Sequence, residues 1–258
     1  TLKIIAGYDE MDSTSADIEV QNYTDYLNGD VKGLKIGIPK EYFNESLDSE
    51  IKKVIETSID ILREQGAVIK EVSLPHTKYA VPTYYIIACA EAASNLSRYD
   101  GVRYGYRGNN DNIEDMYVRS RTEGFGNEVK RRIMLGNYVL SSGFYDAYYK
   151  KASQVRRLIK NDFDKVLEEV DIILTPTSPT TAFKKGEKAQ DPMQMYLADI
   201  YTVSINLAGH PGISVPAGFV NGLPVGIQMI GKYFDEGTLF KVSDKFEKIR
   251  GKIIYPNL

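Results

Sequence analysis

The chain has 258 residues, which is long enough to bury a sizeable core as one large domain or two small ones. Its 43% hydrophobic and 26% charged residues are typical of a soluble globular protein, and a net charge of −3 gives no overall signal for nucleic-acid binding. A single cysteine, Cys89, excludes an internal disulfide, and two histidines cannot form an ordinary zinc site without carboxylates. No apolar run approaches the ~20 residues of a membrane span, so no membrane partner is expected. The single cysteine fits a reducing compartment, and we expect a cytoplasmic protein.

The first half of the chain contains the pattern of one β-α-β unit. Residues 34–39 (LKIGIP) and 67–74 (AVIKEVSL) are predicted strands. Between them lies an amphipathic helix that Asp48 can cap and that Gly66 can end. We therefore expect a parallel pair of strands with a right-handed crossover.

The middle of the chain is predicted to be helical. Residues 79–99 are mostly apolar and are followed by a long polar loop with a short helix inside it. From Asn127 onward the pattern predicts two helices broken near Gly143. We predict that an aromatic cluster in this region packs in a core; it consists of Tyr145, Tyr148 and Tyr149.

The last third predicts strands again. Residues 171–176 (DIILTP) form a strand, residues 195–208 a helix, and residues 236–249 a further helix. Residues 212–216 and 225–230 are two strands joined through Asn221-Gly222, a strong hairpin turn with prolines at the strand limits. The predicted class is α/β, with a mixed, mostly parallel sheet flanked by helices.

The sequence lacks the parts of a complete hydrolase site. The serine pair Ser141-Ser142 lies in a helical pattern without a glycine-rich elbow or a lysine base, and no G-x-S-x-G or nucleotide-binding motif is present. His210, in a turn before a proline, is interpreted as structural, and His76 as exposed. We therefore predict no catalytic and no metal-binding residue in these 258 residues.

Several segments carry a family resemblance. NLAGHPGISVPAG, GLPVGIQMIG and FDEGTLF resemble the C-terminal part of the amidase-signature family, and IAGYDEMDSTS, LKIGIPKEYF, SRTEGFGNEVKRRIMLG and LSSGFYDAYYKKA agree with it. The segment SNLSRYDGVRYGYR is similar to the glutaminase subunits of glutamine-dependent tRNA amidotransferases and is not carried by general amidases. The resemblance covers nearly the whole chain.

The resemblance implies a domain organisation. Amidase-signature enzymes use a Ser-Ser-Lys triad on an N-terminal segment rich in glycine and serine. No such segment occurs in this sequence. Residues 1–258 are accordingly expected to be the C-terminal portion of a single amidase domain, inactive alone and partnered by the N-terminal half of the same polypeptide.

The resemblance also implies a function. In these amidotransferases the glutaminase, or A, subunit releases ammonia from glutamine. The B subunit uses ATP and Mg²⁺ to convert Glu-tRNA(Gln), and often Asp-tRNA(Asn), into the amide. The expected partners are therefore glutamine and the B and C subunits of the amidotransferase, with tRNA bound mainly by the B subunit. No cofactor is expected in this chain.

By motif match, the family's glutamine-binding residues correspond to Tyr84 of YYIIA, Arg132 of KRRI and Asp199 of ADIYT. An arginine suits the carboxylate of a free amino acid and an acid suits its ammonium group. The residues alone favour plainer roles: a helix-surface charge for Arg132, a solvated helix position for Asp199, and core packing for Tyr84.

Two alternative functions stay open at this point. The chain could belong to another amidase-signature hydrolase with a different amide substrate, against which SNLSRYDGVRYGYR argues. It could also be a non-catalytic binding or assembly subunit, which the sequence permits because it lacks the triad.

Overall fold

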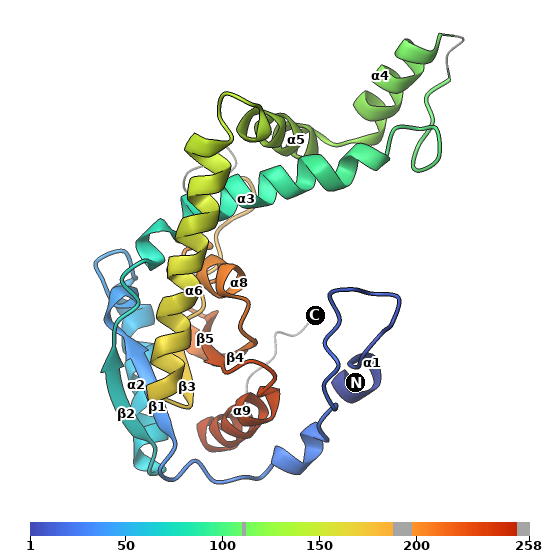
Figure 1. Cartoon of the computed structure of the whole chain (residues 1–258). Helices are drawn as coiled ribbons and strands as arrows, with labels where there is room; N and C mark the ends of the chain where they lie inside the picture. Colours follow the sequence, from blue (N-terminus) through green and yellow to red (C-terminus); the bar gives the residue numbers. More distant parts are fainter. Residues whose placement is uncertain (110–111, 188–197, 252–258) are drawn as a thin grey trace. The chain divides into compact units, whose positions relative to one another are not determined.

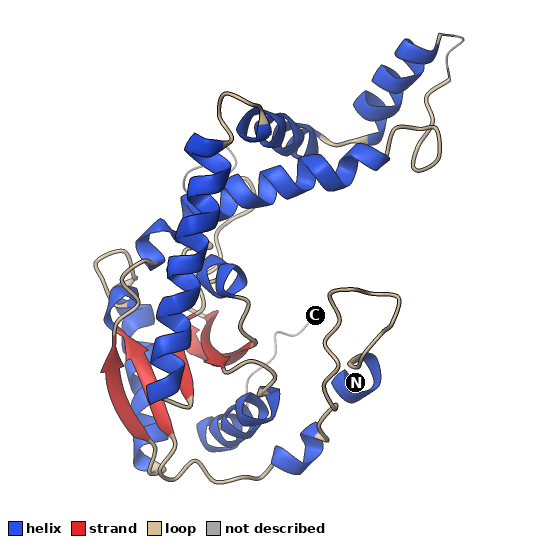
Figure 2. Ribbon diagram, in the orientation of Figure 1, coloured by secondary structure: helices blue, strands red, loops and turns tan. Residues whose placement is uncertain are grey.

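The computed structural model describes residues 1–109, 112–187 and 198–251. The chain divides into two compact units, one formed by Thr1–Lys78 with the chain from Ile159 onward, and one by Tyr79–Leu158. In the described residues all strands belong to the first unit, here called the sheet unit, and the second, the helical unit, contains helices and loops (Figure 2).

The sheet unit is built on a five-stranded sheet with the order β2-β1-β3-β5-β4 (Figure 1). β1 is parallel to β2 and to β3, whereas β5 is antiparallel to both β3 and β4. The predicted α/β class with a mixed sheet is confirmed, with two parallel and two antiparallel neighbour pairs. The strands are β1 Lys35–Pro39, β2 Val68–Val72, β3 Ile172–Pro176, β4 Gly212–Val220 and β5 Leu223–Gly231.

The predicted β-α-β unit is confirmed in its elements and its parallel pairing. α2 Ser49–Glu64 begins where the Asp48 carboxylate accepts hydrogen bonds from the backbone N–H groups of Glu50 and Ile51. Gly66 follows the helix with φ +88°, the left-handed conformation that glycine adopts without a Cβ penalty.

The hairpin of β4 and β5 is longer than predicted. Asn221 and Gly222 form its two-residue turn with φ values of 52° and 78°, as an Asn-Gly pair allows. The strands run on through Pro216 and Pro224, so the prediction that these prolines bound them is wrong. Pro216 is tolerated because β4 is an edge strand of the described sheet and carries a register shift between Pro216 and Gly218.

Helices cover the sheet. α2 and α9 (Glu236–Arg250) both contact β4 and β5 as well as each other. Figure 1 shows α6 (Lys151–Glu169) in front of the sheet and α2 behind it. The core of this unit contains Ile36, Ile51, Phe163, Leu174 and Phe246, all of them fully buried.

The helix predicted over residues 195–208 is shorter. α8 spans Val203–Ala208, residues 198–202 form a turn, and residues 195–197 lie outside the described chain. The turn closes because the backbone oxygen of Asp199 accepts from the N–H groups of Thr202 and Val203. α8 ends at Gly209, which has φ +82°.

His210 follows α8 and is buried, as its predicted structural role requires. Nδ1 lies 3.1 Å from the Gly231 carbonyl oxygen, Nε2 lies 3.1 Å from Oδ1 of Asp164, and the ring stacks on Tyr233 at 4.0 Å. His76 was expected to be exposed and is half-buried instead. The Asp162 carboxylate accepts from both its backbone N–H and its ring Nδ1, which holds the imidazole against α6.

The helical unit consists of α3 Ala80–Asn95, α4 Ile113–Gly124 and α5 Asn127–Leu140, followed by a π-helical turn, Asp146–Lys150, that leads into α6. These helices and the break near Gly143 match the predicted pattern. The tyrosines of this region do not form a core: Tyr145 is 43% and Tyr148 39% exposed, and their rings contact neighbouring rings along the chain rather than an apolar core.

Short elements complete the described chain. These elements are α1 Leu2–Ile5, η1 Tyr23–Tyr26, η2 Lys40–Tyr42, η3 Thr77–Tyr79 and η4 Leu96–Arg98.

None of the described helices combines the length and the apolar character that crossing a membrane requires.

Candidate functional site

Two of the three predicted site residues meet where α3 and α5 cross in the helical unit. The crossing is close because Gly136 has no side chain: a Cβ atom there would lie 2.0 Å from the backbone oxygen of Cys89. Arg132 lies one turn before Gly136 on α5. The contact between Gly136 and Cys89 therefore places Arg132 near the part of α3 that contains Tyr84 and Tyr85.

The guanidinium of Arg132 is partly buried, with 35% of its side chain exposed. Its Nε donates to Oε1 of Glu128 at 3.0 Å, and its Cζ lies 5.8 Å from the centre of the Tyr85 ring. The pKa of Arg132 is raised, chiefly by the hydrogen bond to Glu128, with the hydroxyl of Tyr84 acting in the same direction. The Tyr84 ring in turn meets the Tyr85 ring edge-on at 5.2 Å.

This arrangement suits an anion. A permanently charged guanidinium at a partly exposed position, with an aromatic ring beside it, can bind a carboxylate through parallel hydrogen bonds. Cys89 does not add a nucleophile, because it is buried and burial raises the pKa of its thiol. These side chains therefore offer a positive charge at Arg132 that could hold an anion, without a nucleophile beside it.

Asp199, the third predicted residue, lies in the sheet unit. Its side chain is exposed at the start of the turn before α8. Two contacts of the buried Tyr201 hold this turn in place. Its ring stacks on the Tyr42 ring with 5.1 Å between the ring centres, and its carbonyl oxygen accepts from the Gln228 side chain at 3.0 Å. Gln228 also donates to Thr175 on β3, so this exposed carboxylate stands on a turn anchored to the sheet.

The serine pair has no catalytic surroundings. Ser141 ends α5 and donates its hydroxyl hydrogen to the Tyr138 carbonyl, and Ser142 is exposed in the turn that follows. The two serines thus lie just beyond the helix rather than within it. Among the described residues, no three side chains of histidine, cysteine, aspartate or glutamate are grouped so that they could hold a metal ion.

The segment SNLSRYDGVRYGYR begins in the last residues of α3, continues through η4, and then forms a loop over residues 99–107 that contacts α4. Arg121 donates to the carbonyl oxygens of Leu96 and Tyr99, and the Ser120 hydroxyl accepts from the N–H of Gly108 at 2.9 Å. Tyr106 completes the contact with a 2.6 Å hydrogen bond to Glu123. Hydrogen bonds to α4 therefore hold the loop of this segment in its conformation.

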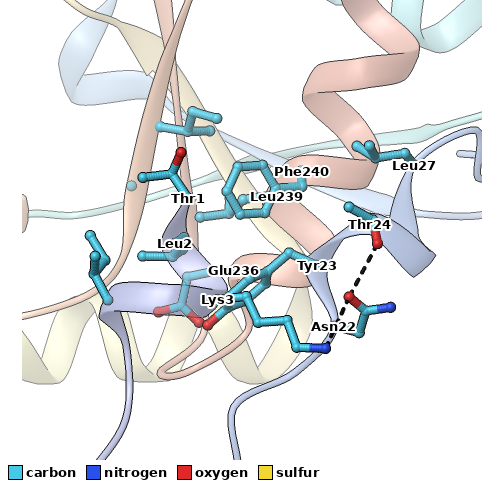
Figure 3. Close-up of a pocket in the computed structure, with 13 residues that line it drawn as sticks. Thr1, Leu2, Lys3, Asn22, Tyr23, Thr24, Leu27, Glu236, Leu239 and Phe240 are labelled. Carbon is cyan, nitrogen blue, oxygen red and sulfur yellow. Dashed lines mark hydrogen bonds between the residues drawn. The ribbon is translucent and has the colours of Figure 1, made fainter.

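Sequence reasoning did not find a cavity of about 670 Å³ in the sheet unit (Figure 3). Leu2 and Ile5 of α1, Ile213 of β4 and Leu239 and Phe240 of α9 give it a mostly apolar wall. Its residues are far apart in the sequence, so no local pattern could have indicated it. The cavity contains none of the three predicted site residues. Its polar edge is shown in Figure 3, where Asn22 Oδ1 accepts from Lys3 and from Thr24.

Glu128 and Tyr85 were also missed, although a signal for Glu128 exists. It precedes Arg132 by four residues in NEVKRR, the spacing at which side chains of a helix meet. Tyr85 follows Tyr84 directly, and only the crossing of the two helices decides which tyrosine faces the guanidinium.

Comparison with curated proteins identifies close relatives. The chain is 62% identical over 248 residues to the A subunit of glutamyl-tRNA(Gln) amidotransferase from Carboxydothermus hydrogenoformans and 60% identical over 246 residues to that from Alkalilimnicola ehrlichii. It is 57% identical over its full length to the protein of that name from Fusobacterium nucleatum. These alignments cover 95–100% of this chain but 51–53% of the relatives, so the chain spans about half their length.

Solved structures agree with the fold. The A subunit of glutamyl-tRNA(Gln) amidotransferase from Thermotoga maritima superposes with a TM-score of 0.72 at 42% identity, covering 93% of this chain and 47% of that one. A bacterial aryl acylamidase of the amidase-signature family superposes at 0.70 with 22% identity, over 94% of this chain and 49% of that one, and so supports the fold alone. The family model described as Amidase matches residues 1–240. The chain therefore belongs to the amidase family.

Proposed function

We propose that this chain is the C-terminal portion of the glutamine-hydrolysing subunit of a tRNA amidotransferase, and that it supplies the glutamine-binding part. The observation that carries the proposal is the uniform name of the curated relatives that align with 95–100% of the chain at 57–62% identity. The alternative of another amide hydrolase has less support, because identity falls from 42% to 22% between the amidotransferase structure and the aryl acylamidase.

In this proposal Arg132 binds the α-carboxylate of glutamine, Tyr84 lines the same site, and Asp199 binds the α-ammonium group. The contacts around Arg132 support the first two roles, since the guanidinium is charged, partly exposed and close to Tyr84. The exposed carboxylate of Asp199 on its anchored turn supports the third. Hydrogen bonds to charged groups contribute about 1.5–3 kcal/mol each, so losing one weakens binding roughly ten- to a hundredfold.

The test uses the full-length glutaminase in its complex. Arg132→Ala and Asp199→Ala are each expected to raise the KM for glutamine by about ten- to a hundredfold, while tRNA amidation with free ammonia continues at the normal rate. Arg132→Lys keeps the charge but loses the two-pronged bond, so its KM should lie between those of the wild type and Arg132→Ala.

Arg157→Ala is the matched control, because Arg157 is an exposed helical arginine of the same unit. An unchanged KM in both site variants would show that the assignment is wrong. A parallel loss of the ammonia-dependent reaction would indicate damage to the fold instead, and Arg132→Lys would then decide the role of Arg132.

A second part of the proposal concerns chemistry. The 258 residues alone are expected to release no ammonia from glutamine, because the Ser-Ser-Lys triad of the family is carried on a segment outside them. The proposed partners are the B and C subunits of the amidotransferase, with ATP and Mg²⁺ used by the B subunit, in the cytoplasm. Ammonia release by the purified chain that disappears on Ser142→Ala would contradict this part.

A further inference from the structure

Arg132 is held on two sides by residues of its own unit. Along α5 its Nε donates to Oε1 of Glu128 at 3.0 Å, while Oε2 of the same carboxylate lies 3.2 Å from Nη1 of Arg131. Across the crossing with α3, the guanidinium lies over the Tyr85 ring. The hydrogen bond fixes one edge of the guanidinium and the ring supports its face.

The edge that Glu128 uses decides what is left for a ligand. A guanidinium can bind a carboxylate through its side edge, which includes Nε, or through its end, where the two Nη groups point the same way. Glu128 uses the side edge. In the described residues no hydrogen bond joins either Nη of Arg132 to another group, so these donors are not used within the unit.

The charges around Glu128 also leave the site cationic. One carboxylate lies between two guanidinium groups, those of Arg131 and Arg132, so the three side chains together carry a net positive charge. A carboxylate that approaches the end of Arg132 therefore meets an attractive field, although Arg132 already has an anionic neighbour.

We propose that Glu128 is a positioning residue, which orients the guanidinium of Arg132 so that its two Nη groups receive the carboxylate of the substrate. The inference rests on the proposed function, in which Arg132 binds the α-carboxylate of glutamine. The opposite role, in which Glu128 competes with the substrate for Arg132, predicts an opposite change in affinity.

The test is kinetic and uses the full-length glutaminase in its complex. The side chains of Arg132 and Glu128 are 35% and 48% exposed, and pairs that are this accessible to solvent have small energies. Glu128→Ala should therefore raise the KM for glutamine about two- to fivefold. Neither kcat nor amidation with free ammonia should change. Glu128→Gln keeps an oxygen that can accept from Nε, and its KM should lie between the wild-type value and that of Glu128→Ala.

Asp146→Asn is the matched control, because Asp146 and Lys150 form another exposed ion pair at the i,i+4 spacing in the same unit. It should leave the KM unchanged. In a double variant with Arg132→Ala, Glu128→Ala should not change the KM further. This result separates positioning through Arg132 from a general electrostatic effect of the Glu128 charge.

Two results would overturn the inference alone: a lower KM in Glu128→Ala, which shows competition, or an unchanged KM while Arg132→Ala raises it. If Arg132→Ala itself leaves the KM unchanged, the proposed binding role fails and this inference fails with it. Should Glu128→Ala not fold, Glu128→Gln gives the same decision, because it preserves the size of the side chain.

Discussion

The sheet unit buries several of its largest side chains completely, whereas most of the aromatic side chains of the helical unit are exposed. Tyr201, Phe163 and Phe246, the largest fully buried side chains of the described residues, all belong to the sheet unit. The helical unit instead exposes Tyr104, Tyr138 and other rings, and contains eleven of the nineteen tyrosines.

The charges differ in the same way. Residues 79–158 contain twelve lysines and arginines against eight acidic residues, whereas the rest of the chain contains twenty against twenty-seven. Several of these arginines bind backbone carbonyl groups, as Arg121 does at Leu96 and Tyr99. The comparison indicates that an apolar core stabilises the sheet unit, while close helix contacts and hydrogen bonds hold the helical unit.

The largest expected effect is a difference in stability between two variants, each of which loses one phenylalanine ring from one unit. Phe163→Ala removes a fully buried ring from the sheet unit and should cost about 3–5 kcal/mol of unfolding free energy. Phe144→Ala removes a ring that is 37% exposed in the helical unit and should cost less than about 1 kcal/mol. Urea unfolding followed by circular dichroism measures both, and equal losses would contradict the contrast.

A smaller effect is expected at the helix crossing. Gly136→Val places a side chain against the backbone oxygen of Cys89, so α3 and α5 must separate at a cost of about 1–3 kcal/mol. Because Arg132 lies one turn away, the same variant should also raise the KM for glutamine in the full-length glutaminase.

Gly143→Ala is the control for this variant, since a Cβ atom at Gly143 meets nothing within 4 Å. It should melt close to the wild-type temperature. If Gly136→Val melted as Gly143→Ala does, close contact between the two helices would not be what holds the helical unit.

The difference between the units also explains what the sequence could predict. The hairpin turn at Asn221-Gly222, the Asp48 cap and the parallel pair depend on local patterns with few alternatives, and all three are present. The extra length of β4 and β5 was missed because edge position and a bulge, which depend on tertiary structure, make proline acceptable.

The candidate site was predictable in part for the same reason. Motif comparison indicated Tyr84 and Arg132, and the structure brings them together. Glu128 precedes Arg132 by four residues on α5, a spacing that the sequence does show, whereas the partner Tyr85 depends on how α3 and α5 cross, which is set by the missing side chain of Gly136. The exposed tyrosines of this unit were expected in a core because an aromatic cluster looks alike in sequence whether it faces inward or outward.

The smallest expected effect tests one buried polar contact of the sheet unit, the one around His210. The pKa of His210 is lowered from its ordinary value because burial disfavours the charged ring, with the Asp164 carboxylate opposing that shift and the Lys160 ammonium adding to it. Tyr233 stacks on the same ring. Both ring nitrogens face acceptors, the Gly231 carbonyl at Nδ1 and the Asp164 carboxylate at Nε2, so the neutral ring can donate to one of them and the charged ring to both.

The sign of the pH dependence follows from that direction. Well above a pH of about 6.5, His210 is neutral in both the folded and the unfolded chain, and its full contribution to stability is present. As the pH falls through that value the unfolded chain gains a proton first, so stability declines by up to about 1.4 kcal/mol per pH unit and levels off below the folded pKa. Asp164→Asn removes the opposing carboxylate and should extend the decline to lower pH, whereas His210→Asn should remove it. Because the chain has two histidines, NMR titration with His76→Gln for assignment identifies the His210 signal, and a His210 pKa above the ordinary value of 6.5 would contradict the predicted direction.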